Sequence, residues 1–556
     1  MTAPAGPRGR AVQTLAGAAL MITLVTLASR VVGFGRWLAQ ASFVGTGGVD
    51  APFNSANLLP NVLFEVAAGG ALAGAVVPLL SGYLVRGDRE QASRTASALL
   101  GWTLVVLLPI GALMALLARP IAGLLQLDDP ASVDIATGFL RVFALQVPMY
   151  GIAVVLGGIL QAHKRFFWPA FAPLVSSLVV IGAYAGFAAF ADGNQQDLDA
   201  LTTQALSWLA WGTTVGVAFL ALPLVIPTYR TGIRLRPTLR FPDGEGRRAA
   251  RLAFAGVGAL VAQQLSVLAI MGAANESAGP GAFTVYLYAQ QVYLLPYAVL
   301  AFPIATSAFP RFSEHAAQQR WDELRRLVGT TTRLLLVTVG CGVAALLAAA
   351  PLVESAFDTV ALGDAYGLAA ALTWMAPGLV GFALILQLSR VLYALDAGRA
   401  AVVATATGWA VVAAGAAVTV LVFGGTQGAD LAVRAEVLAW LGAAGTAGMV
   451  VAGVGLLLAV RARLGGAALR GVARTLGVVA VAAAGGALLG RWALPAPDRA
   501  GSGPSPVEVP FELSWFVTDV GRGLLAGLVA AVVVLVAVAV TDRDVRGRLR
   551  SRITRR

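Results

Sequence analysis

Fourteen apolar runs, each of about twenty residues, recur along this 556-residue chain. They centre near residues 23, 66, 106, 148, 180, 215, 262, 295, 340, 380, 412, 447, 480 and 530. About twenty apolar residues are what an α-helix needs to cross the hydrocarbon core of a bilayer. Charged residues make up only 12% of the chain, about half their share in soluble domains. The sequence therefore predicts an all-α polytopic membrane protein with about 14 transmembrane helices.

The basic residues test this number of helices. If the N-terminus lies in the cytoplasm, 31 of the 40 Lys and Arg residues fall in loops on the inner side and 5 fall in loops on the outer side. Cytoplasmic loops of membrane proteins are enriched in Lys and Arg, and one missed helix would scramble the pattern after it. We therefore expect both termini in the cytoplasm, and the net charge of +12 needs no nucleic-acid partner.

Two short patterns recur 232 residues apart. Val77-Pro78 closes the second run and Phe309-Pro310 closes the eighth, and the connectors at residues 161–163 and 393–395 share the same offset. Parallel repeats are a known transporter plan, with the substrate site between the halves near the midplane. We predict two parallel six-helix lobes, residues 1–230 and 231–465. Residues 466–556 would hold helices 13 and 14 and a basic cytoplasmic tail.

Several catalytic motifs are missing from the chain. Its single lysine, Lys164, does not stand in the Gly-Lys-Ser/Thr context of a P-loop, and two histidines, His163 and His315, do not form an HExxH motif. The single cysteine, Cys341, excludes an internal disulfide and a CxxC metal site. We therefore expect no enzyme activity, no cofactor and no metal site. Transport would draw on a gradient, on the membrane potential or on the substrate's own concentration difference.

Polar and charged residues inside the first two runs are the candidate site. Such residues are costly in a bilayer and usually face a cavity or a partner. One interpretation is a cationic cavity for an anionic head group; the other is Arg–Asp pairing that joins helices 1 and 2. Arginines in helices 4 and 10 fit a cavity or snorkelling toward the interface equally well. The candidates are Ser29, Arg30 and Arg36 in helix 1, Asp50, Asn61 and Glu65 in helix 2, Arg141, and Arg390.

These strings are similar to those of the MurJ/MviN family. The resemblance runs from about residue 15 to residue 400. It includes Ser29-Arg30-x-x-Gly33-Phe34-x-Arg36, Asp50-Ala51, Leu59-Pro60-Asn61, residues 158–162 with 165–173, residues 309–313 and residues 390–395. The resemblance implies a lipid II flippase of the multidrug/oligosaccharidyl-lipid/polysaccharide exporter superfamily. Such a protein serves peptidoglycan synthesis, cell wall biogenesis and cell shape from the bacterial plasma membrane.

The resemblance also implies an alternating-access mechanism. Helices 1, 2 and 8 would line a cationic cavity for the pyrophosphate-linked sugar, and helices 13 and 14 would form a groove for the polyprenyl tail. The family's cavity arginines on helix 1 match Arg30 and Arg36, and its acidic residue matches Asp50. Partners would be lipid II or a similar polyprenyl-pyrophosphate glycan, membrane lipids, a monovalent cation and cell-wall synthesis proteins.

The chain departs from the family pattern at several cavity positions. Phe64 and Glu65 stand where many members have an Arg-Arg pair, and Gln290-Gln291 replaces an Asp-Arg pair on helix 8. We still expect Gln291 to contact the substrate, together with Arg390 on helix 10. The lower number of cations leaves open a flippase or exporter for another polyprenyl-linked oligosaccharide. A cation-coupled drug exporter of the same superfamily, a non-transporting scaffold and an integral-membrane enzyme are further alternatives.

Overall fold

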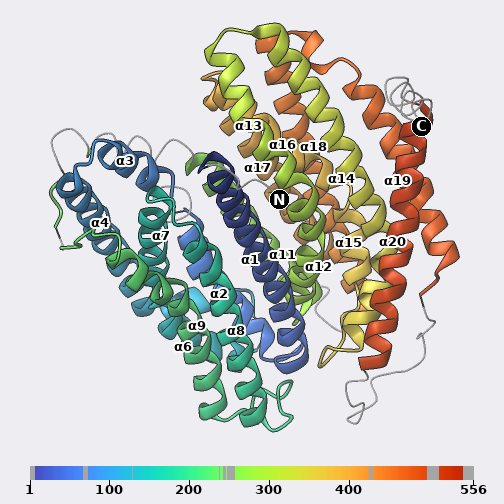
Figure 1. Cartoon of the computed structure of the whole chain (residues 1–556). Helices are drawn as coiled ribbons and strands as arrows, with labels where there is room; N and C mark the ends of the chain where they lie inside the picture. Colours follow the sequence, from blue (N-terminus) through green and yellow to red (C-terminus); the bar gives the residue numbers. More distant parts are fainter. Residues whose placement is uncertain are drawn as a thin grey trace, which may run out of the picture. The chain divides into compact units, whose positions relative to one another are not determined.

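The computed structural model describes residues 7–66, 73–127, 129–236, 238–241, 246, 257–424, 430–496 and 513–541. The chain divides into two compact units, Met1–Leu260 (unit 1) and Val261–Arg556 (unit 2). Both consist of helices, and no described residue lies in a β-strand (Figure 1). The predicted all-α class is therefore confirmed. The division into residues 1–230, 231–465 and 466–556 stays a prediction, and the basic tail lies outside the described residues.

Unit 1 begins with one long helix followed by shorter ones. Polar residues before several helices explain where these helices start, because their side chains accept a backbone N–H of the first turn. Asp88 accepts from the amide of Gln91 at 3.0 Å, and Thr202 accepts from the amide of Ala205 at 3.2 Å. The helices are α1 (Pro7–Phe43), α2 (Asp50–Leu63), α3 (Ala73–Val85), α4 (Arg89–Leu116), α5 (Ala118–Ala122), α6 (Pro130–Phe143), α7 (Gln146–Ala162), α8 (Phe167–Ala191) and α9 (Thr203–Tyr229).

Aromatic side chains form the core of unit 1 near one end of the helices. Phe53 of α2 packs edge-to-face on Phe139 and Phe143 of α6 and on Tyr184 of α8, with ring centroids 5.7 to 6.0 Å apart. Each such edge-to-face pair contributes about 0.5–1.5 kcal/mol beyond the area that it buries. Helices α1 and α9 both pack on α8. This arrangement fixes α1, α2, α7 and α8 around one another, and these helices carry the polar residues described below.

Unit 2 is built around a 38-residue helix, α14. A short π-helical turn interrupts the run before it, directly after Pro296, which lacks the amide that a regular helix would use there. The elements are α11 (Val257–Ala278), α12 (Ala282–Pro296), η2 (Tyr297–Ala301), α13 (Phe302–Ala317), α14 (Trp321–Asp358), α15 (Leu368–Met375), α16 (Gly378–Ala394), α17 (Gly398–Phe423), α18 (Leu431–Leu464), η3 (Gly466–Leu469), α19 (Val472–Ala493) and α20 (Leu513–Thr541).

The last two helices pack side by side on α14 (Figure 1). Small residues allow this contact, as is common between membrane helices. A Cβ on Gly340 of α14 would lie 2.1 Å from Cγ1 of Val479 of α19, and one on Gly490 would lie 2.8 Å from the carbonyl oxygen of Ala526 of α20. Helices α19 and α20 are therefore an integral part of unit 2.

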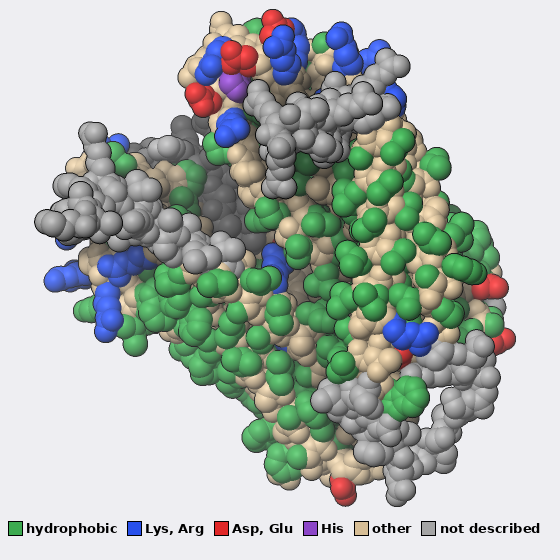
Figure 2. Space-filling model, turned by 45° about the vertical axis from the view of Figure 1, so that its right-hand side comes forward, with side chains coloured by type: hydrophobic (Ala, Val, Ile, Leu, Met, Phe, Trp, Pro, Cys, Tyr) green, Lys and Arg blue, Asp and Glu red, His purple; other side chains and the backbone are tan. Residues whose placement is uncertain are grey.

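Eleven described helices are long and apolar enough to cross a membrane, or twelve when the bent pair α15 and α16 is one span. Helix α1 and the pair α2 and α3 lie at the two other predicted positions. The number of about fourteen is compatible with this result and stays a prediction. Hydrophobic side chains cover the sides of the helices, and most charged side chains lie toward their ends (Figure 2). A lipid environment explains such a surface, since water would oppose it.

Helix boundaries repeat at the offset expected from the sequence. Helix α3 ends at Val85 and α13 ends at Ala317, 232 residues later. Helices α7 and α16 match at both ends with the same offset. The two short sequence patterns therefore belong to a longer repeat of helix lengths and connections.

Left-handed backbone conformations repeat at the same offset. Gly87 and Gln319 have φ of 74° and 54°, and Lys164 and Asp396 have φ of 59° and 54°. A positive φ is uncommon for residues other than glycine. Because three of these four residues are not glycine, the shared conformation reflects a shared connector geometry at the helix ends.

We predict that the stability of unit 2 depends on the close contact between α17 and α18. A Cβ on Gly448 would lie 2.5 Å from the carbonyl oxygen of Gly408, whereas no atom lies within 4 Å of a Cβ on Gly445 of the same helix. Gly448→Leu should destabilise the protein by about 1–3 kcal/mol, because overpacking forces the helices apart. Thermal unfolding in detergent should show a lower Tm for Gly448→Leu and an unchanged Tm for Gly445→Leu. Equal Tm values for the two variants would contradict the packing.

Candidate functional site

Helix α1 carries three of the predicted site residues, and they differ in their surroundings. The hydroxyl of Ser29 donates to the carbonyl oxygen of Ala170 on α8 at 2.8 Å, so Ser29 joins two helices. Arg30 is exposed and Arg36 is half-buried. Neither guanidinium forms an ion pair with a carboxylate among the described residues. The Arg–Asp pairing that would only fasten helices together is therefore not seen at these two arginines.

Arg36 lies among aromatic and neutral polar groups of unit 1. Its guanidinium carbon is 5.7 Å from the ring centroid of Trp37, and its charge interacts electrostatically with Tyr150 of α7 and Tyr184 of α8. Open space flanks the helix nearby, because no atom lies within 4 Å of a Cβ built on Gly33 or Gly35. Arg36 thus offers N–H donors to an incoming anion without a protein carboxylate competing for them.

A chain of hydrogen bonds extends from these tyrosines into α1 and α2. The hydroxyl of Tyr150 donates to Oδ1 of Asn61 at 3.0 Å, and the hydroxyl of Tyr184 lies 3.4 Å from Oε1 of Gln40. Nε2 of Gln40 donates to Oδ1 of Asn54 at 2.9 Å. Of these residues, only Asn61 was predicted from the sequence as part of the site. Polar side chains inside apolar runs, such as tyrosine, glutamine and asparagine, are the sequence signal that could have identified the remaining residues.

The acidic candidates of helix 2 occupy two different places. Glu65 is exposed just after α2 and interacts electrostatically with Tyr150. Asp50 is fully buried at the start of α2, where its Oδ1 accepts from the amide of Gly48 at 2.8 Å. Asp50 is the first residue of α2, and α1 ends before it at Phe43. Its Oδ1 therefore organises the loop between the two helices.

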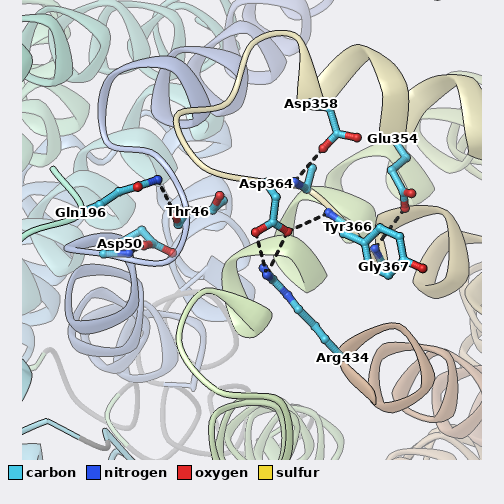
Figure 3. A network of polar contacts seen from close by, with 11 residues as sticks. Thr46, Asp50, Gln196, Glu354, Asp358, Asp364, Tyr366, Gly367 and Arg434 are labelled. Atoms are coloured by element: carbon cyan, nitrogen blue, oxygen red, sulfur yellow. Dashed lines mark hydrogen bonds and ion pairs between the residues drawn. The ribbon is translucent and has the colours of Figure 1, made fainter. Parts of the chain in front are cut away.

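The loop that holds Asp50 is fastened to the connection between α8 and α9. The amide of Val49 donates to the carbonyl oxygen of Gln195 at 3.0 Å, and Nε2 of Gln196 donates to the carbonyl oxygen of Thr46 at 3.4 Å (Figure 3). A Cβ on Gly48 would lie 2.3 Å from the carbonyl oxygen of Gln195, so only glycine fits this approach. These contacts close one end of unit 1.

In unit 2, the two remaining candidates lie on α12 and α16. Gln291 is half-buried and makes no hydrogen bond to a described residue. The guanidinium of Arg390 lies 5.9 Å from the ring centroids of both Phe302 and Phe309 on α13, and its Nη1 is buried without a hydrogen-bond partner in the described part of the chain. Arg390 thus has free donor capacity, whereas Arg141 of unit 1 is simply exposed.

An ion pair between a buried arginine and a half-exposed aspartate, which the sequence did not indicate, lies at the connection between α14 and α15. Arg434 of α18 is only 6% exposed, and its Nη1 lies 3.0 and 3.3 Å from the two carboxylate oxygens of Asp364 (Figure 3). Glu354 accepts from the amides of Gly367 and Ala369 at 3.1 and 2.7 Å, which caps α15. From the sequence alone, Arg434 is one of the five basic residues expected in loops on the outer side.

Two polar contacts attach the final helices to the rest of unit 2. Asp519 of α20 is 1% exposed and accepts from the hydroxyl of Ser355 on α14 at 2.8 Å. Arg491 of α19 donates from Nε to the carbonyl oxygen of Leu347 at 2.7 Å and from Nη2 to the hydroxyl of Thr373 at 3.0 Å. In the described ranges, no cluster of three or more His, Cys, Asp or Glu side chains could hold a metal ion.

The family profile of lipid II flippase MurJ matches residues 40–493, which is most of the chain. The chain belongs to the MurJ family. The resemblance to this family is thereby confirmed, while the string at residues 29–36 of helix 1 precedes the matched residues. The chain is accordingly a multi-pass membrane protein of a flippase family, which implies the bacterial plasma membrane.

Curated relatives of the MurJ family chain come from several bacteria. A probable lipid II flippase MurJ of Rhizobium meliloti is 27% identical, with 60% of this chain and 61% of the relative covered. The protein of the same description from Synechocystis sp. is 26% identical, over 65% of this chain and 70% of the relative. That of Rhizobium tropici is 30% identical, over 49% and 50%. The matches therefore leave between 30% and 50% of each relative uncovered.

Solved structures share the fold. The structure described as lipid II flippase MurJ in an inward closed conformation has a TM-score of 0.68 at 15% identity, covering 92% of this chain and 98% of that chain. An inward-facing multidrug resistance MATE transporter of the MOP superfamily has a TM-score of 0.62 at 16% identity, covering 81% and 98%. At these identities the likeness concerns the fold alone.

We predict that Asp364 stabilises unit 2 because it neutralises Arg434. Asp364→Asn should lower the free energy of unfolding by about 1–3 kcal/mol, since it leaves a buried guanidinium without its counter-charge. The double variant Asp364→Asn/Arg434→Gln should lose less than the sum of the single variants in a double-mutant cycle. Asp134→Asn is the control, because the Asp134–Arg119 pair is exposed on both sides and should contribute below about 1 kcal/mol. Additive losses at positions 364 and 434 would contradict this role.

Proposed function

We propose that this MurJ family chain is a lipid II flippase, which moves a polyprenyl-pyrophosphate-linked glycan from the inner to the outer leaflet. The observation that supports the proposal is that Arg36, in a predicted membrane span, has no carboxylate partner in the described residues. Gly33 and Gly35 on the same helix are flanked by open space. Guanidinium groups offer fork-shaped donors that suit phosphate oxygens. Family membership supplies the substrate class that carries such a phosphate.

The other candidate residues have distinct proposed roles. Tyr150 and Asn61 form a neutral hydrogen-bonded pair near Arg36 and leave its guanidinium free for a phosphate. Arg30 is a second phosphate contact from the same helix, 9 Å or so along the axis by helix geometry. Within unit 2, the proposed substrate contacts are Gln291 and Arg390, whose Nη1 has no partner in the described residues. Ser29, Asp50 and Glu65 shape the helices that carry these contacts.

The proposed mechanism is alternating access with no cofactor and no chemical step. Both termini lie in the cytoplasm, and the acidic helix ends of unit 1 face outward. Lipid II and membrane lipids are the proposed partners, and a monovalent cation and cell-wall synthesis proteins are further ones. The chain acts as a transporter and not as an enzyme.

One specific observation favours a second candidate within the same class. The ring of Phe64 is tilted against that of Tyr150, with centroids 4.6 Å apart, at a position where the family resemblance implies an arginine. The ring of Phe64 can stack on the apolar face of a substrate sugar, whereas it cannot bind a second phosphate charge as an arginine would. The alternative is therefore a flippase for another polyprenyl-linked oligosaccharide. A drug exporter for cationic substrates fits less well, because Arg30 and Arg36 would repel a cation.

We predict that Arg36 is required for flipping. Arg36→Gln should abolish rescue of a bacterial strain depleted of its own lipid II flippase, and lipid II should accumulate in the inner leaflet. Arg141→Gln removes an exposed arginine of the same unit and should rescue as well as the original protein. Immunoblots of membrane fractions check that the variants are present in equal amounts. Full rescue by Arg36→Gln would reject the assignment.

We also predict that the membrane potential drives export. A pyrophosphate carries about two negative charges, and each gains about 2.3 kcal/mol per 100 mV when it moves out of a negative cytoplasm. Collapse of the potential with valinomycin at matched potassium should therefore slow outward flipping in proteoliposomes that contain the purified protein. A rate that is unchanged after the collapse would exclude this driving force.

A further inference from the structure

A cavity of about 510 Å³ lies at the end of unit 1 that carries most of its basic residues. It is bounded by α7, by the last turns of α9 and by the extended segment that follows α9. The volume is in the range of small-molecule sites, about 300–1,000 Å³. The lining residues are Leu156, Val225, Thr228, Tyr229, Ile233, Arg234, Leu235 and Arg236.

One side of the cavity is apolar and continuous with the outer surface of the helices. Leu156 and Ile233 belong to the hydrophobic core between α3, α4, α7 and α9. Val225 is 48% exposed and Tyr229 is 77% exposed, so the apolar side opens toward the surroundings of the helices. Tyrosine is enriched at the height of lipid head groups. The cavity therefore meets the bilayer near its interface.

The other side of the cavity offers donors without partners. Thr228 is 2% exposed, and its Oγ1 has no hydrogen-bond partner among the described residues. Arg234 and Arg236 are exposed, and neither guanidinium pairs with a described carboxylate. The nearby Glu90 is already paired with Arg94 at 2.6 Å. A buried hydroxyl beside two free guanidinium groups matches the acceptor oxygens of one phosphate group.

The segment that presents these arginines is held in place by its backbone. The amide of Arg234 donates to the hydroxyl of Ser93 at 3.3 Å, and the amide of Arg236 donates to the hydroxyl of Ser97 at 3.0 Å, both on α4. Nε1 of Trp102 donates to the carbonyl oxygen of Leu239 at 3.0 Å. Because backbone amides make these contacts with α4, the two guanidinium groups remain available to a ligand.

We propose that this cavity binds an anionic phospholipid of the inner leaflet. The phosphate lies against Arg234, Arg236 and the hydroxyl of Thr228, and one acyl chain follows Leu156 and Val225 into the bilayer. Basic pockets at the cytoplasmic end of membrane helices bind such head groups. A zwitterionic lipid brings no net charge to the two arginines. The site lies within unit 1 and does not depend on the proposed transport activity.

The test is native mass spectrometry of the purified full-length protein in detergent with added phosphatidylglycerol. The original protein should retain phosphatidylglycerol over phosphatidylcholine with the same acyl chains. Arg234→Gln/Arg236→Gln should reduce this preference by about tenfold or more, because each basic residue at an anionic surface contributes about fivefold. Arg461→Gln/Arg463→Gln is the matched control, since both arginines are exposed at the basic end of α18. The control should keep the preference of the original protein.

Two further variants keep the test decisive if the arginine variant is unstable. Leu156→Trp fills the apolar side and Thr228→Val removes only the hydroxyl, and both should weaken retention while the charges stay. Inorganic phosphate should fail to displace the lipid, and undecaprenyl phosphate should displace it less well than phosphatidylglycerol does. The proposal is overturned by equal retention in the double arginine variant and its control, by displacement with phosphate alone, or by stronger binding of undecaprenyl phosphate.

Discussion

Arg36, in a helix that the sequence predicts to cross the membrane, sets the main physical constraint on this protein. Transfer of a charge into hydrocarbon costs several kcal/mol, so an arginine survives there only beside water, polar groups or a partner. Arg36 is surrounded by Tyr150, Tyr184 and Trp37 and by no described carboxylate. Two separate neutral contacts, Tyr150 with Asn61 and Tyr184 with Gln40, lie near this charge and do not cancel it. A passing phosphate can therefore supply the missing negative charge.

Helices of unit 2 pack through small residues, and the plan of helices repeats along the chain. Glycines at the contacts between α14 and α19 and between α17 and α18 bring backbones together where no hydrophobic effect between helices is available. Matching ends of α7 and α16, and the left-handed residues Lys164 and Asp396, indicate one helical plan used twice. The final pair, α19 and α20, adds to unit 2 through the buried contact of Asp519 with Ser355.

Apolar length and the distribution of arginines predicted the class and the approximate positions of the helices, because these depend on local composition. Two short patterns 232 residues apart predicted the repeat. The candidate arginines could also be predicted from the sequence, since a charge within an apolar run is easily recognised. Pairings between distant segments could not be predicted in this way. The contact of Arg434 with Asp364 joins residues 70 positions apart, and Tyr150 meets Asn61 across 89. The sequence also could not show that Oδ1 of Asp50 accepts from the amide of Gly48, because this contact depends on the turn between α1 and α2.

The most direct test of the central claim compares two ligands with the same polyprenyl chain, one with and one without the pyrophosphate group. Undecaprenyl pyrophosphate and undecaprenol can be titrated separately onto the purified protein and onto its Arg36→Gln variant, with binding followed by native mass spectrometry. The account predicts that the original protein binds the pyrophosphate at least about tenfold more tightly, as expected for a charge-assisted contact, and that the variant loses this difference. Equal discrimination by the two proteins would contradict the role given to Arg36.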